Sequence, residues 1–278
     1  MIFKFKLLII LFIFIVSCAD KEKQISEIVE VDIELQMSNA YKQGYLEFQK
    51  GDAILAAKKF NEAELLFPQS PWAAKSALMA AYVYYNQGYY SDSIYELERY
   101  LTTYPKHNDK PYAHFLLGMS FYETIVDEKK DLRSILDAKK QFEIIIKEYP
   151  ATEFATDAKF KIDLITEIQA GKEMYLARYY LDRSKWIPAL NRYKKVVNKY
   201  STTIYAEEAL HRLVEINFRL GLIEESKKYA KTLGYNYQSS DWYKNTYKLF
   251  NKKYRDGIKE LQNDKEKGLI KKFKGLFE

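Results

Sequence analysis

The stretch AAKKFNEAELLFP, residues 56–68, carries a spacing that recurs along the chain. Ala56, Phe60 and Ala63 fall at intervals of four and three, and Pro68 follows five positions later. Residues at these intervals share one face of an α-helix, and proline is typical of the positions just after a helix ends. The stretch therefore predicts an amphipathic helix with a defined end.

Four later segments repeat this spacing. In the last two of these copies, serine or glutamine stands in place of the proline. The corresponding residues of the four copies are Ser93, Leu97, Tyr100 and Pro105; Ala138, Phe142, Ile145 and Pro150; Ala189, Tyr193, Val196 and Ser201; and Ser226, Ala230, Leu233 and Gln238. Twelve residues before the first of these positions stand Gly44, Ala81, Ala177 and the larger Val214, whereas Gly118 stands twenty before its own copy. An aromatic residue usually follows three positions later, as at Tyr84, Phe121 and Tyr180.

A small residue followed by this helix pattern resembles the tetratricopeptide repeat, in which two antiparallel helices form each unit and neighbouring units stack. We therefore predict an all-α chain, a superhelical solenoid of about five helix pairs. The copies begin 37, 45, 51 and 37 residues apart, so two of them contain additions. One is expected as a loop at 125–134, and the other as a long helix over 154–182.

The N-terminus predicts export and a lipid anchor. Lys4 and Lys6 precede ten apolar residues, 7–16, which is too short a run to span a bilayer as a helix. Ser17 and Cys18 then complete a pattern that resembles a bacterial lipobox, and Cys18 is the only cysteine. We expect N-acyl and S-diacylglycerol groups on Cys18 and no other cofactor. A plain signal peptide or an uncleaved anchor is the alternative.

These features divide the chain into four segments. Residues 1–17 are the expected signal, 18–37 a linker, 38–250 the repeats, and 251–278 a basic tail. Residues 244–278 hold eleven Lys or Arg against five Asp or Glu, which equals the net charge of +6 for the chain. Nucleic acid is not an expected partner, because export would remove the protein from it.

The sequence predicts no catalytic or metal site. The three histidines, His107, His114 and His211, cannot form a metal-binding pair four residues apart on a helix, and no phosphate-binding glycine loop occurs. Aromatic residues are instead dense around the first two repeats. We expect Phe67, Trp72 and Tyr84 to bind extended segments that end in aromatic residues, since aromatic rings give a large contact area.

The lipobox, the five repeats, the addition in the third and the long helix entering the fourth together resemble the BamD family of outer-membrane lipoproteins. The resemblance covers residues ~38–250 and includes the segment ALNRY, residues 189–193. It implies an outer-membrane, lipid-anchored, periplasm-facing scaffold without enzymatic activity. The implied partners are the POTRA domains of the barrel-forming subunit BamA, other lipoproteins of the complex and unfolded β-barrel proteins.

The resemblance also implies roles for individual residues. Arg192 and Tyr179 would contact BamA, and Phe67 would lie near the substrate. Arg192 stands off the apolar stripe of its predicted helix, so we expect it to point outward and to tolerate reversal of its charge without loss of stability. A pilus-assembly or division-coordination adaptor with the same repeats is the main alternative. A glycan-binding lipoprotein and an enzyme fit the sequence less well.

Overall fold

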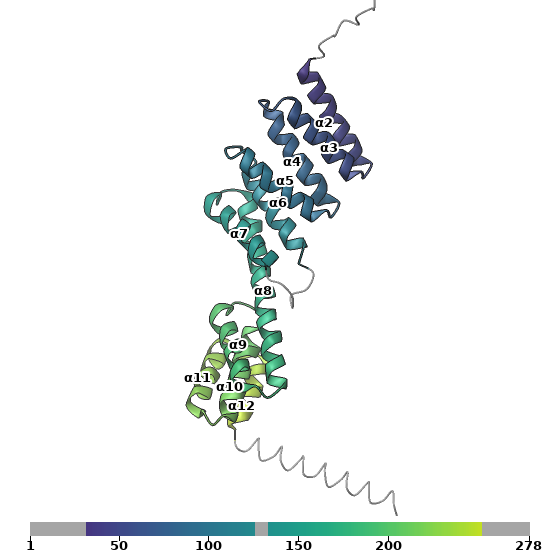
Figure 1. The fold of residues 1–278 in the computed structure, drawn as a ribbon. Coiled ribbons are helices and arrows are strands. Elements are labelled where there is room, and N and C mark those ends of the chain that lie inside the picture. The colour runs from purple at the N-terminus through teal and green to yellow at the C-terminus, as the bar shows by residue number, and fades with distance from the viewer. Residues whose placement is uncertain (1–31, 126–132, 252–278) are drawn as a thin grey trace, which may run out of the picture. The chain divides into compact units, whose positions relative to one another are not determined.

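The computed structural model describes residues 32–125 and 133–251, and within these ranges the regular structure is entirely helical. Ten helices form successive pairs, and an eleventh follows (Figure 1). The pairs are α2 (Ile33–Gln49) with α3 (Ala53–Leu66), α4 (Pro71–Asn86) with α5 (Tyr90–Thr103), α6 (Lys110–Glu123) with α7 (Arg133–Glu148), α8 (Glu153–Asp182) with α9 (Trp186–Lys199), and α10 (Ala206–Arg219) with α11 (Ile223–Asn236). The five predicted helix pairs are therefore confirmed.

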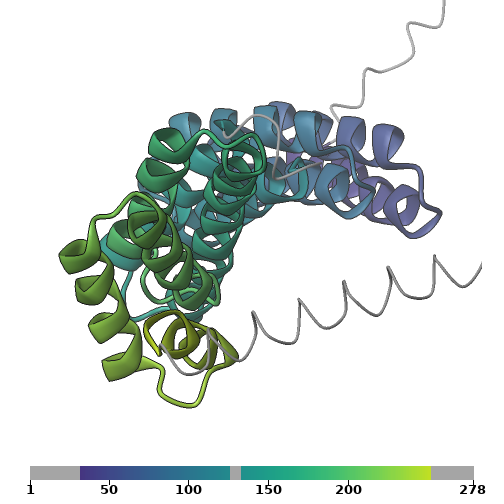
Figure 2. The ribbon, with the colours of Figure 1, turned by 90° about the horizontal axis from the view of Figure 1, so that it is seen from below.

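The chain divides into two compact units, Met1–Ser76 and Ala77–Glu278, with the division inside α4. In the first unit α2 packs on α3. In the second unit, from α6–α7 onward, the two helices of each pair pack on one another, and each pair packs on the next pair along the chain. The final helix, α12 (Asp241–Phe250), lies against both α10 and α11 (Figure 2).

The small residue at the start of the repeat pattern lets the two helices of a pair approach closely. A Cβ atom at Gly44 on α2 would lie 3.1 Å from the ring of Phe60 on α3. The same relationship links Gly118 on α6 to Phe142 on α7. Where the facing residue is serine, its hydroxyl binds the opposite backbone, since Ser93 Oγ donates to the Ala81 carbonyl at 3.0 Å.

The recurring positions of the second helix in each pair form the core. All fifteen are buried except Ala230, which is half-buried. Ser226 repeats the bond made by Ser93, because its Oγ donates to the Val214 carbonyl at 2.9 Å. A buried hydroxyl without a partner would cost free energy, so this bond explains why serine is tolerated at a core position.

Each second helix ends two residues before the predicted proline position, whether or not proline is present. The helices that precede Ser201 and Gln238 end at the same place as those that precede Pro68, Pro105 and Pro150. The residue directly after each helix is aromatic and half-buried in all five copies: Phe67, Tyr104, Tyr149, Tyr200 and Tyr237. Four of the 25 tyrosines of the chain therefore occupy this position.

The structure locates one of the two additions and the start of the first repeat. The long helix expected over 154–182 is α8, which spans 30 residues. Helix α2 begins at Ile33, inside the segment 18–37 expected as a linker, because the Asp32 carboxylate caps it by accepting from the Glu34 backbone N–H at 3.0 Å. Residues 1–17, Cys18, most of the loop 125–134 and the tail from 252 lie outside the described residues.

Candidate functional sites

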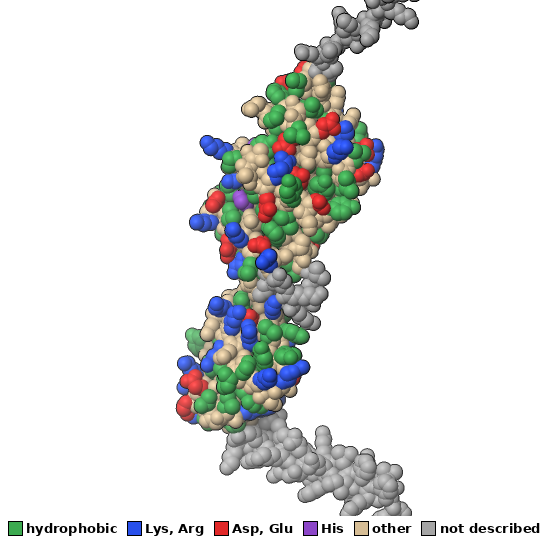
Figure 3. Space-filling model, in the orientation of Figure 1, with side chains coloured by type: hydrophobic (Ala, Val, Ile, Leu, Met, Phe, Trp, Pro, Cys, Tyr) green, Lys and Arg blue, Asp and Glu red, His purple; other side chains and the backbone are tan. Residues whose placement is uncertain are grey.

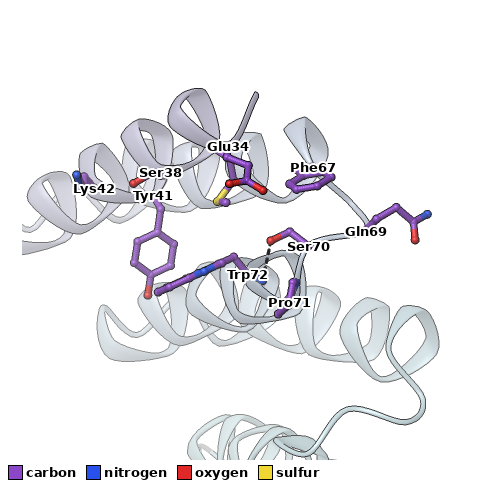
Figure 4. A pocket seen from close by; sticks show the side chains of 10 residues that line it. Glu34, Ser38, Tyr41, Lys42, Phe67, Gln69, Ser70, Pro71 and Trp72 are labelled. Atoms are coloured by element: carbon purple, nitrogen blue, oxygen red, sulfur yellow. Dashed lines mark hydrogen bonds between the residues drawn. The ribbon is translucent and has the colours of Figure 1, made fainter. Parts of the chain in front are cut away.

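The first unit contains a pocket of about 720 Å³ beside helix α2 (Figure 4). One side is formed by α2 and the other by the turn that joins α3 to α4. The lining residues are Glu34, Met37, Ser38, Tyr41, Lys42, Phe67, Gln69, Ser70, Pro71 and Trp72. Two of the three aromatic residues predicted to bind substrate, Phe67 and Trp72, are therefore brought together.

The turn between α3 and α4 positions these two aromatic residues. The Ser70 backbone N–H donates to the Phe67 carbonyl at 3.0 Å, which closes the turn. The Ser70 side chain then accepts from the Trp72 backbone N–H at 3.1 Å, as a helix-capping serine does. Phe67 therefore enters the pocket before the turn, and Trp72 enters it from the first turn of α4.

An aromatic cluster forms one wall of the pocket. The Tyr41 ring packs edge-to-face on Trp72 and on Phe60, with centroid distances of 5.5 and 5.0 Å. Burial, followed by the nearby Tyr45, raises the pKa of Tyr41, so its hydroxyl stays protonated at neutral pH. Trp72 nevertheless remains 47% exposed, with Lys75 Nζ 4.7 Å from its ring centroid. An exposed indole beside a pocket offers a stacking surface to a ligand.

The remaining lining residues combine apolar and charged groups. Met37 is buried, whereas Glu34 and Lys42 are exposed and lie about two helical turns apart on α2. An apolar wall with polar groups at its edge is typical of sites for peptides or small molecules.

Tyr84, the third predicted substrate residue, belongs to the second unit. Its half-buried ring packs edge-to-face on Tyr89, with the centroids 6.4 Å apart. Its pKa is raised by burial and, to a smaller extent, by Asp92 and Glu96. Phe67 in turn has a structural role as well, because it is the aromatic residue that follows the second helix of its repeat.

Arg192, the predicted partner-binding residue, lies on α9 and is bound to a buried carboxylate on α8. Its Nη1 donates to Glu173 Oε2 at 2.9 Å, and Lys195 Nζ donates to Glu173 Oε1. Glu173 is 4% exposed, while the side chains of Arg192 and Lys195 are each 38% exposed. Arg192 does lie off the core stripe, as expected, but its internal carboxylate partner was not predicted.

The two cations keep Glu173 ionised. Burial alone would raise the pKa of this carboxyl, but the hydrogen bonds from Lys195 and Arg192 and their positive charges outweigh burial, so the pKa is lowered. Losing one partner of such a buried pair is costly, because a charge is then left uncompensated. The expectation that reversing the Arg192 charge leaves stability unchanged is therefore revised.

Tyr179, the second predicted partner-binding residue, is 42% exposed near the end of α8. The Arg183 guanidinium stacks on its ring at 3.7 Å, and the ring packs edge-to-face on Tyr180. Tyr179 follows Glu173 by six residues, which turns its direction about 120° around the helix from that of Glu173. Among the described residues, no hydrogen bond or cation–ring contact joins Tyr179 to Arg192.

Residues 33–233 match the model of the YfiO family, described as an outer membrane lipoprotein. An outer membrane protein assembly factor BamD of Caulobacter vibrioides is 34% identical over 237 residues, which cover 85% of this chain and 77% of that protein. The chain belongs to this YfiO/BamD family. The BamD of Rickettsia prowazekii is 35% identical over 218 residues, which cover 78% of this chain and 87% of that protein.

The match to the BamD family spans both candidate sites. Residues 33–233 include α2 through most of α11, and therefore the pocket, Glu173 and Arg192, but not α12. Among solved structures, a putative kinesin light chain with TPR-like repeats is 14% identical, with a TM-score of 0.34 and coverage of 76% of this chain and 100% of that one.

Two sets of residues at these sites are not predicted from the sequence. Met37 and Tyr41 on α2 were not singled out, although Tyr41 lies three positions before the small residue Gly44 and could have been placed on the paired face. Glu173 was not singled out because it is 19 residues from Arg192 and carries no motif.

Neither a metal cluster nor a membrane-spanning helix is found in the part of the chain that the structure describes. No group of three or more His, Cys, Asp or Glu there could hold a metal ion. None of the described helices is both long enough and apolar enough to cross a bilayer. The three histidines bind side chains or backbone groups within the protein, as in the bond of 2.9 Å between His114 Nδ1 and Gln141 Oε1.

Proposed function

We propose that this protein is a non-enzymatic scaffold of the outer-membrane protein assembly machinery. It is held at the outer membrane by lipid on Cys18 and faces the periplasm. Membership of the BamD family supports the assembly role, and the lipobox-like sequence around the single cysteine supports the anchor. The acyl chains would anchor the protein firmly, because each buried CH₂ contributes about 0.8 kcal/mol.

The first unit receives the C-terminal segments of unfolded β-barrel proteins. The observation that carries this assignment is the convergence of Phe67 and Trp72, both expected from sequence to contact substrate, on one pocket. The half-exposed indole of Trp72 suits a terminal aromatic side chain, and the mixed lining suits an extended backbone.

The second unit docks on the POTRA domains of BamA, with Arg192 and Tyr179 as contacts, and other lipoproteins of the complex bind nearby. Both side chains are partly exposed, so both are accessible to a partner. Figure 3 shows Lys and Arg side chains interspersed with hydrophobic ones on one face of this unit, and a positively charged surface of this kind suits an acidic partner.

Site-specific photo-crosslinking tests the substrate site. A photoreactive residue is placed at Trp72, Phe67 or Tyr84 in the full chain, which is then mixed with a peptide that carries a C-terminal β-barrel signal. Ile54 on α3 is the matched control, because it is 65% exposed in the first unit and does not line the pocket. Crosslinks from positions 72 and 67, and none from 54, are the expected result.

Two other outcomes would move the site. Equal crosslinking from positions 54 and 72 would indicate nonspecific contact with the first unit. Crosslinks found only from positions on α8 to α11 would assign peptide binding to the second unit. A peptide with its terminal aromatic residue replaced by alanine controls for the contact with Trp72.

A further inference from the structure

Helix α9 carries a stripe of positive charge. Arg192, Lys195 and Lys199 follow one another on α9 at intervals of three and four residues, which places them within about 60° of one another around the helix, and Lys185 is the residue just before its first turn. Lys185 and Lys199 are exposed, and Arg192 and Lys195 are partly so. The stripe is therefore accessible to an acidic partner.

Glu173 is the internal carboxylate at the centre of this stripe. Each of its oxygens accepts from a different cation, one from Arg192 and the other from Lys195. Because Glu173 is only 4% exposed, it is held by packing and cannot follow a mobile side chain outward. Because Glu173 carries one negative charge and Arg192 and Lys195 carry two positive ones, the three side chains together keep a net positive charge.

The bond to Glu173 occupies Nη1 of Arg192, whereas a guanidinium carries five N–H donors in a planar fork. The side chain is 38% exposed, so a partner can reach it at the surface of the unit. Fixing one edge of a guanidinium restricts its rotamers before a partner arrives, and such preorganisation lowers the entropic cost of binding.

We propose that Glu173 is a positioning residue that holds Arg192 so that its guanidinium bridges Glu173 and a carboxylate of an acidic segment on the docking partner. This inference rests on the proposed docking of the second unit to BamA. Glu173 does not touch the partner. Lys195 neutralises the second oxygen of Glu173, which leaves the outward edge of Arg192 for the partner's carboxylate.

The test measures the affinity of the full chain, purified in detergent, for the purified POTRA region of BamA by biolayer interferometry. Glu173→Gln is expected to weaken binding about tenfold, mainly through faster dissociation, since an ordered side chain is lost. Glu208→Gln is the matched control, because Glu208 pairs with Arg178 between α8 and α10 in the same unit, whereas Arg192 and Lys195 pair with Glu173. Its affinity is expected to stay within about twofold of the parent.

A double-mutant cycle separates positioning from a purely structural role. In the Arg192→Gln background, Glu173→Gln is expected to cause no further loss of affinity, because Glu173 acts through Arg192. Arg192→Lys supplies a second measurement if Glu173→Gln folds poorly. Lysine keeps the charge but lacks the fork, so this variant is expected to bind nearly as weakly as Arg192→Gln.

Three results would overturn the inference alone. Unchanged or tighter binding by Glu173→Gln would show that charge alone governs the site. An equal loss with and without Arg192 would show a structural role, and full binding by Arg192→Lys would exclude the bridge. If Arg192→Gln itself binds normally, the proposed docking site fails together with the inference, which is distinguishable from failure of the inference alone.

Discussion

Gly118 on α6 lies directly against the ring of Phe142 on α7. A Cβ atom at Gly118 would come within 2.7 Å of Cε1 of that ring, which is closer than side chains in folded proteins approach. Phe142 is fully buried, so its ring has little room to move away. The spacing of this helix pair therefore depends on the absence of a side chain at position 118.

Gly118→Ala is accordingly expected to destabilise the protein. Alanine favours a helix over glycine by about 1 kcal/mol, whereas overpacking a core costs about 1–3 kcal/mol, so the net loss is expected to reach up to about 2 kcal/mol. Denaturant unfolding of the purified protein measures it. Gly171→Ala is the control, because the nearest atom there is the hydroxyl tip of Tyr205, which can shift. Greater stability of both variants would contradict the packing argument.

The sequence predicts this contact in part. Position 118 could be identified as a small residue paired with the second helix, because the repeat spacing marks it. The closeness of the approach and the identity of the contacting ring atom depend on side-chain packing, which spacing does not specify. The aromatic residues after each second helix could also have been found, since they precede the predicted proline position in all five copies.

The buried His211 is expected to make the C-terminal helices sensitive to acid. Its Nδ1 bonds Thr246 Oγ1 at 2.8 Å, and its ring packs on Trp242, both on α12. Burial lowers the pKa of His211; Glu215 and Glu208 oppose this effect, and Arg212 adds to it. The unfolded chain then binds the proton more readily, so stability is lost as pH falls below about 6.5, the ordinary histidine value.

Trp242 fluorescence measures this effect when Trp72 and Trp186 are replaced by phenylalanine. As the pH is lowered from about 7.5 to about 5.5, the denaturant concentration at the unfolding midpoint is expected to decrease. The decrease is expected to be smaller when His211→Gln is added. His114, whose pKa is also lowered mainly by burial, remains in both proteins and so cancels from the comparison. The same pH dependence with and without His211 would contradict the assignment.

Trp72→Ala is expected to weaken binding of a peptide with a C-terminal aromatic residue by about fivefold to thirtyfold, which corresponds to about 1–2 kcal/mol for one aromatic contact. The reason is its half-exposed ring beside Tyr41 in the pocket. Fluorescence anisotropy with a labelled peptide measures the affinity, and Ile54→Ala is the control. A peptide that binds both variants equally well does not use the pocket.

Cys18→Ala is expected to leave the protein soluble or unprocessed. The thiol at position 18 is the only one in the chain and directly follows the expected signal, so no other residue can accept the diacylglycerol. Membrane fractionation with acyl labelling is the measurement. If the variant remains in the membrane fraction and keeps its label, the anchor lies elsewhere.

The environment of Arg192 was the part of the site least accessible from sequence. An arginine off the core stripe was predicted from helical rotation, but its partner comes from another helix, 19 residues away. Such a pair depends on how α8 and α9 cross and on the rotamers of both side chains. The repeat spacing contains neither kind of information, so only the structure could identify Glu173.

The pairing leads to a final prediction, that Arg192→Glu destabilises the protein more than Arg192→Gln does. Glutamate at 192 would place a second negative charge beside buried Glu173 and leave Lys195 as the remaining cation bound to it. Leaving a buried charge poorly compensated costs up to about 3–5 kcal/mol, and partial exposure at position 192 reduces this, so we expect a difference of about 1–2 kcal/mol. Because the penalty requires the charge of Glu173, it should disappear when Glu173→Gln is present in both variants. Thermal unfolding of the four proteins at neutral pH measures the effect, and a difference between Glu and Gln at 192 that persists without Glu173 would show that another group causes it.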